Sequence, residues 1–145
     1  MKRIRIFGCQ FEPSLKEDLR SATIYYRDLL LPRKRKLDIT IVLKKNLLDD
    51  RGIFGECWDN DYHAFNIVID KDLSYKNKLV TLAHEMVHVK QFARGQLKFG
   101  CGKDKWLGKV YPIDTPYNKL PWEKEAEEFE GIIYKCWKKH QQLID

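Results

Sequence analysis

The chain of 145 residues suits a single domain with one hydrophobic core, and its 43% hydrophobic and 33% charged residues are typical of a folded globular protein. No apolar run could span a membrane, and no apolar segment follows the basic N-terminus, so we expect a cytoplasmic protein without membrane contact. The net charge of +6 permits an anionic partner without requiring one. The cysteines are widely spaced and form no C-x-x-C pair, so we expect free thiols at Cys9, Cys57, Cys101 and Cys136.

The N-terminal third of the chain predicts a strand or docked arm, a helix and a further strand. Apolar residues within 4–7 can form the first of these. Residues 15–31 carry apolar side chains at helical spacing, and Ser14 is the expected N-cap. Residues 37–43 are rich in β-branched side chains, which favour a strand. The basic run at 33–36 predicts an exposed turn, with a nucleic-acid contact as the alternative.

The middle of the chain predicts two antiparallel strands. Residues 53–58 and residues 62–70 read as strands, the second with alternating apolar side chains. The Asp-Asn-Asp sequence at 59–61 predicts a tight turn between them, and strands joined by so short a turn must be antiparallel. Calcium binding by the two aspartates of this turn is not expected, because their spacing does not fit a calcium loop and no downstream glutamate completes one.

A buried helix is predicted at residues 79–94. The segment contains no glycine or proline, and Gly95 can cap its end. Its apolar residues occur on more than one side, as in helices that are covered on several sides by the rest of the protein.

This helix carries the pattern H-E-x-x-H. His84 and His88 are four residues apart, so their imidazoles lie on one face, close enough to share a metal ion. Glu85 lies about 100° further round the helix, where it can take a proton from a water on that metal. Zinc is the expected ion. The alternative is a chance match, with both histidines packed or exposed.

Residues 96–119 separate this helix from the last one and contain several glycines and prolines. Because a long loop without structure is uncommon in a compact domain, we expect either a functional loop or a short hairpin. A group of lysines surrounds Trp106 and could contact nucleic acid weakly: Lys98, Lys103, Lys105 and Lys109. Pro121 then opens the last helix, at a position where proline is tolerated.

A catalytic zinc usually has three protein ligands and one water, so a third ligand is needed. The other histidines are His63 and His140, and a carboxylate is therefore expected. Glu123 is our choice because it lies in the first turn of the last helix, beside its apolar face. Glu127, one turn later, could accept a hydrogen bond from a ligating imidazole. The alternatives are that these acids only complement the helix dipole, or that His140 is the third ligand.

The H-E-x-x-H pattern, followed by E-x-x-A-E at residues 123–127, resembles the gluzincin branch of the zincin metallopeptidases. Membrane-bound members carry E-x-x-A-D, so a glutamate replaces the aspartate here. The resemblance covers residues 53–137 and extends to small phage- or bacteria-encoded zincin-like proteins. It implies an α+β, zincin-like fold, in which a small antiparallel or mixed sheet packs on the HExxH helix and a C-terminal helix bears the third ligand.

The same resemblance implies a zinc-dependent metallopeptidase. One Zn²⁺ would be held by His84, His88 and Glu123, with Glu85 as general base and Glu127 supporting a ligand. The substrate would be a protein or peptide. Zincins commonly bind it as an added strand, for which residues 53–58 or 62–70 could offer the sheet edge. Further donors to the developing oxyanion are expected at Tyr111 or Tyr117.

Two other functions fit the sequence. SprT-like proteases act on DNA-bound proteins, and the net charge and the lysines around Trp106 are compatible with such a role. Their third ligand is a downstream histidine, for which only His140 could serve here. The second is a non-catalytic interaction protein with a structural zinc, such as a phage factor that binds a host protein.

Overall fold

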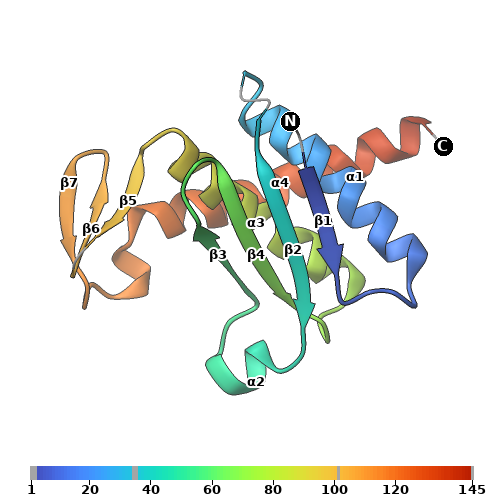
Figure 1. Ribbon diagram of the computed structural model, residues 1–145, viewed down its shortest axis with the longest axis horizontal. Helices are drawn as coiled ribbons and strands as arrows, with labels where there is room; N and C mark the ends of the chain where they lie inside the picture. The colour runs from blue at the N-terminus through green and yellow to red at the C-terminus, as the bar shows by residue number, and fades with distance from the viewer. Residues whose placement is uncertain (1–2, 34–35, 101, 145) are drawn as a thin grey trace.

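The computed structural model describes residues 3–33, 36–100 and 102–144. Over these residues the chain has an α+β architecture with a mixed four-stranded sheet, an antiparallel three-stranded sheet and four α-helices (Figure 1). The α+β class predicted from the sequence is therefore confirmed. None of the helices in the described segments is long and apolar enough to cross a membrane.

The larger sheet has the strand order β1-β2-β4-β3. Strands β1 (Arg3–Phe7), β2 (Asp38–Lys44) and β4 (Ala64–Asp70) are parallel, and β3 (Gly55–Asp59) pairs with β4 in the antiparallel direction. Because β4 has a partner on each side, it offers no free edge, and the expectation that residues 62–70 could bind a substrate strand is wrong. The edge at the β3 side belongs to β3 itself.

The strands follow the predicted alternation of side chains. The buried isoleucines of β2 and β4 point to the helical side of the sheet: Ile39, Ile41, Ile67 and Ile69. Strand β4 was predicted to start at residue 62 but starts at Ala64. Asp61, Tyr62 and His63 all have positive φ (67°, 54° and 62°) and therefore belong to the turn before it. The Asp59 side chain accepts a hydrogen bond from the Asp61 amide and stabilises that turn.

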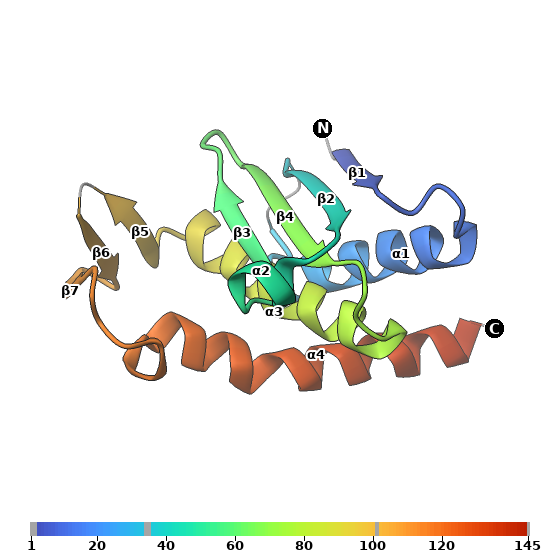
Figure 2. The ribbon, with the colours of Figure 1, turned by 90° about the horizontal axis from the view of Figure 1, so that it is seen from below.

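Three helices lie on one side of this sheet: α1 (Pro13–Leu30), α3 (Tyr75–Ala93) and α4 (Pro121–Ile144) (Figure 2). Helix α3 packs against the sheet as well as against α1 and α4, so it is apolar on several sides and carries much of the core. It starts four residues earlier than predicted. Ser74 is its N-cap, and the Ser74 hydroxyl accepts a hydrogen bond from the Asn77 amide.

Two N-terminal expectations are corrected. Helix α1 starts at Pro13 with Glu12 as N-cap, so Ser14 is not the cap; proline occupies the first turn, where its missing N–H costs nothing. The short helix α2 (Leu47–Arg51) was not predicted, and the buried carboxylate of Asp70 accepts a hydrogen bond from the Leu48 amide in its first turn. Two residues of the basic run, 34 and 35, lie outside the described residues.

The segment between α3 and α4 holds more structure than one hairpin. It forms the antiparallel strands β5 (Leu97–Gly100), β6 (Lys103–Trp106) and β7 (Lys109–Pro112), followed by the short 3-10 helix η1 (Tyr117–Lys119). In both ribbon views β5 is the strand of this smaller sheet that lies nearest to β3 (Figures 1 and 2).

Three of the four cysteines are described, and all three are free thiols, as predicted; the fourth, Cys101, lies outside the described residues.

Candidate metal centre

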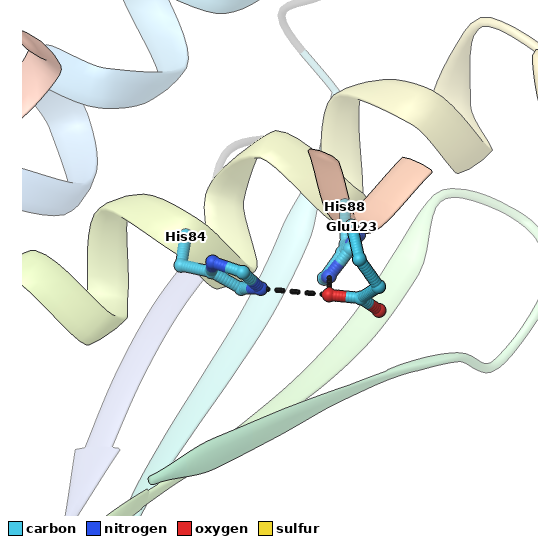
Figure 3. A group of neighbouring side chains, drawn as sticks. All are labelled: His84, His88 and Glu123. Atoms are coloured by element: carbon cyan, nitrogen blue, oxygen red, sulfur yellow. Dashed lines mark hydrogen bonds and ion pairs between the residues drawn. The ribbon is translucent and has the colours of Figure 1, made fainter. Parts of the chain in front are cut away.

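Helix α3 places His84 and His88 one turn apart on the side that faces α4, with their ring centroids 4.9 Å apart. Glu123 reaches them from the first turn of α4. Its Oε1 atom lies 2.9 Å from His84 Nε2 and 3.1 Å from His88 Nε2 (Figure 3). The structure thus brings together the three side chains that the sequence predicts as metal ligands. One potential ligand atom from each lies within 4.8 Å of the others.

His140, the alternative third ligand, lies elsewhere. It stands roughly 25 Å further along the axis of α4 than Glu123, at about 1.5 Å per residue. Its ring packs on Tyr25 of α1, with centroids 5.0 Å apart. Among the two candidates, only Glu123 reaches the imidazoles of α3.

The outer nitrogen of each imidazole also has a partner. His88 Nδ1 lies 2.8 Å from Gln91 Oε1, and the Gln91 amide group donates to the Trp122 carbonyl at 3.0 Å. An amide oxygen can only accept, so His88 carries its proton on Nδ1 when neutral and leaves the Nε2 lone pair free for a metal. His84 Nδ1 lies 3.8 Å from Glu130 Oε2.

Sequence reasoning missed Gln91 and Glu130 and assigned this supporting role to Glu127 instead. The side chain of Glu127 lines the same cavity and interacts with the hydroxyl group of Tyr117. For Gln91 the available signal was its position three residues after His88 on the same helix. For Glu130 the signal would have been its spacing of seven residues from Glu123, which repeats the same face of the helix.

Glu85 is 4% exposed and lines the cavity beside the two histidines. Burial raises the pKa of its carboxyl group to about 7, although the charges of the two histidines oppose this shift. A carboxylate of raised pKa is a stronger base than an exposed one, which suits a group that accepts a proton near neutral pH.

The three clustered side chains form a charged network. Burial disfavours imidazolium, but the hydrogen bond to Glu123 and the charges of Glu85 and Glu123 outweigh it and raise the pKa of His88 to about 9. The pKa of His84 is also raised, again against the effect of burial. The pKa of Glu123 is lowered well below its usual range, because hydrogen bonds from both imidazoles overcome its burial.

A cavity of about 690 Å³ contains the cluster. One of its walls is β3, the edge strand, which passes close over α3 at Gly55. A Cβ atom on Gly55 would lie 2.7 Å from Thr81 Cγ2 and 2.7 Å from the Val68 carbonyl oxygen, and 3.5 Å from Glu85 Oε2. Only glycine fits there, and no pattern in the sequence had pointed to this residue.

The two candidate tyrosines differ in position. Tyr117, in η1, lines the cavity and donates its hydroxyl proton to Glu123 Oε1 at 3.1 Å. Tyr111 packs edge-to-face on Trp122 with centroids 5.5 Å apart, and Lys109 lies over its ring. Tyr117 is therefore the tyrosine positioned to act at the cluster, and Tyr111 is a packing residue.

The donor set fits zinc. Two imidazole nitrogens and one carboxylate oxygen are ligands that zinc prefers, and three protein ligands leave one tetrahedral position for water. Hydrogen bonds among the three side chains hold these donor atoms close together. Comparison of the chain with protein-family models, with curated proteins and with solved structures found no match in any of the three. What the site does must therefore follow from its own residues and geometry.

Proposed function

We propose that the protein is a zinc-dependent metallopeptidase with a zincin-like fold, and that His84, His88 and Glu123 hold its zinc ion. The observation that carries this proposal is the convergence of these three donors with the buried Glu85, in one cavity walled by β3, which is an edge strand of the sheet among the described residues. A metal site that only stabilised the fold would need neither the basic carboxylate nor the open cavity.

Each residue then has a definite task. Zinc, when bound, supplies a Lewis acid that polarises the scissile carbonyl and lowers the pKa of the attacking water. Glu85 takes a proton from that water and later passes it to the leaving amine. Tyr117, which lines the cavity, donates a hydrogen bond to the developing oxyanion. The free edge of β3 binds the peptide backbone as an added strand.

The substitution Glu85→Gln tests the proposal. It keeps the shape of the side chain and removes the base, so the variant should bind one zinc ion per chain and lose at least about 100-fold in peptide hydrolysis. Zinc content by elemental analysis and cleavage of a peptide mixture by mass spectrometry provide the two measurements. Full activity of the variant, or a metal-replete wild type that cleaves no peptide, would instead favour the non-catalytic, structural-zinc interpretation.

One observation favours a second candidate, a DNA-associated protease. Lys98 and Lys105 are directly opposite each other in the smaller sheet, and Lys103 lies on the same face. Like charges in opposite positions destabilise a sheet, so an anionic partner would relieve this repulsion. A salt-dependent mobility shift of duplex DNA that weakens in the Lys98→Ala/Lys105→Ala variant would support this role; no shift at low salt would refute it.

A further inference from the structure

The cavity that contains His84, His88 and Glu123 has two chemically different ends. At one end lies the segment that enters β3, with Arg51 and Phe54. At the other lie four apolar side chains, which we call the aromatic wall: Phe92, Leu97, Phe99 and Trp122. These four come from the end of α3, from β5 and from the start of α4, so the wall adjoins His88 and Glu123 directly.

The aromatic wall is a firm apolar surface with one exposed member. Trp122 and Leu97 are each 2% exposed and form its base. Phe99 packs edge-to-face on Phe92 and on Trp122, with centroids 5.2 Å and 6.2 Å away, but remains 58% exposed. Covering the exposed part of such a ring with another apolar group is favourable, because it removes apolar surface from water.

The direction of β3 relates this wall to the candidate catalytic residues. β3 starts at Gly55, next to Glu85, and ends at Asp59, which pairs with Phe65 of β4. Phe65 in turn stacks on Phe92 of the aromatic wall, with centroids 6.4 Å apart. The strand edge therefore runs from the general base towards the aromatic wall.

This direction fixes which part of a substrate would meet the wall. A peptide that pairs with β3 in the antiparallel direction, the slightly more stable arrangement, has its amino-terminal part beside the end of β3. We therefore propose, on the basis of the proposed function, that the enzyme prefers peptides with a large apolar side chain on the amino side of the cleaved bond. The aromatic wall binds that side chain, and Phe99 is its specificity-determining residue.

Quenched-fluorescent peptides that differ only at the residue before the cleaved bond test this preference. Those with Phe or Leu at this position should be cleaved with a kcat/KM about 10- to 100-fold higher than those with Ala, Glu or Lys, as expected for burial of a large apolar group. In Phe99→Ala this ratio should fall close to one, and in Phe99→Leu it should be partly restored. Phe11→Ala, at an exposed phenylalanine outside the cavity, is the matched control and should keep the wild-type ratio.

Binding separates this inference from the proposed function. Fluorescence anisotropy of the same peptides, labelled with fluorescein, is measured with zinc-loaded Glu85→Gln protein. Tighter binding of the Phe peptide, lost in the added Phe99→Ala variant, supports the aromatic wall even if the wild type cleaves nothing. Equal cleavage of all peptides, a preference on the carboxyl side of the bond by mass spectrometry, or failure of every peptide to bind would each overturn the inference.

Discussion

A single oxygen atom, Oε1 of Glu123, is shared by both imidazoles and by the hydroxyl group of Tyr117. Two largely buried imidazoles and the exposed Tyr117 thus share one acceptor, and without it the imidazoles would be poorly partnered. The arrangement holds the ligands close to one point in space, so little reorganisation would accompany the arrival of a metal ion.

The substitution Glu123→Ala should lower the affinity for zinc by at least about 100-fold, because it removes one of the three protein ligands. Glu128→Ala, at an exposed glutamate of the same helix, is the matched control and should bind zinc as the wild type does. Competition with a chromophoric zinc chelator gives both affinities. An unchanged affinity in Glu123→Ala would show that another group completes the site.

At the scale of residues, the sequence was sufficient to predict that the two histidines and Glu123 lie close together. The helical repeat brings the histidines together, and the position of Glu123 in the first turn of the next helix limits where it can point. The contact between His84 and Glu130 could not be predicted, because it depends on how α3 and α4 cross, which no local pattern determines. Gln91 lies within reach of His88 on the same helix, but its second contact, with the Trp122 carbonyl, depends on the same crossing.

At the scale of elements, the close approach of β3 to α3 forms one wall of the cavity. Gly55 allows the edge strand to pass over Thr81 and Glu85 without a side chain between them. The close approach also covers Glu85, whose pKa is raised by burial. The position of β3 and the basicity of the carboxylate are therefore linked through one glycine.

We expect Gly55→Ala to lower the free energy of unfolding by about 1–3 kcal/mol, because the added methyl group would overlap a backbone oxygen and force β3 outward. Zinc should still bind, whereas peptide hydrolysis should fall. In Gly131→Ala of α4 the methyl group meets open space, so the same substitution should leave stability unchanged or raise it by up to about 1 kcal/mol. Urea unfolding and zinc content test both variants, and a Gly55→Ala variant with wild-type stability would contradict the expectation.

Periodicity predicted α1 and β4 well, because each has a clear hydrophobic repeat. It failed for the smaller sheet, whose strands are four residues long and too short to show a repeat. The parallel pairing of β1, β2 and β4 could not be predicted from the sequence either, since it depends on where α1 returns the chain for β2 and where α2 and β3 return it for β4.

At the scale of the whole molecule, the site couples folding to pH. In the metal-free folded protein, Glu85 and His88 remain protonated to higher pH than they do in the unfolded chain. Folding raises the pKa of Glu85 from 4.5 to about 7 and that of His88 from 6.5 to about 9. The pKa of His84 is raised as well. The lowered pKa of Glu123 has the opposite effect on stability: the stabilising contribution of this carboxylate is lost as the pH falls. This loss occurs only at acidic pH.

The midpoint of thermal unfolding of the metal-free protein should therefore decrease as the pH rises from about 5 to about 9. Zinc should reverse this trend, because the metal binds neutral imidazole and competes with protons at low pH. In metal-free Glu123→Ala the decrease should be smaller, since Glu123 raises the pKa of both histidines. Scanning calorimetry of chelator-treated and zinc-loaded samples measures the trends, and a metal-free midpoint that rises over this range would refute the expectation.

Two of the proposed ligands are neighbours on one helical turn, but Glu123 lies 35 residues beyond His88 in the sequence. An ion bound by both would act as a cross-link that closes this stretch of chain into a ring, and rings of that size restrict the unfolded chain appreciably. The ring contains the whole of β5, β6 and β7. Metal loading would thus anchor both ends of the small sheet at once, so that the ion that we propose to activate water would also hold the proposed substrate pocket in shape.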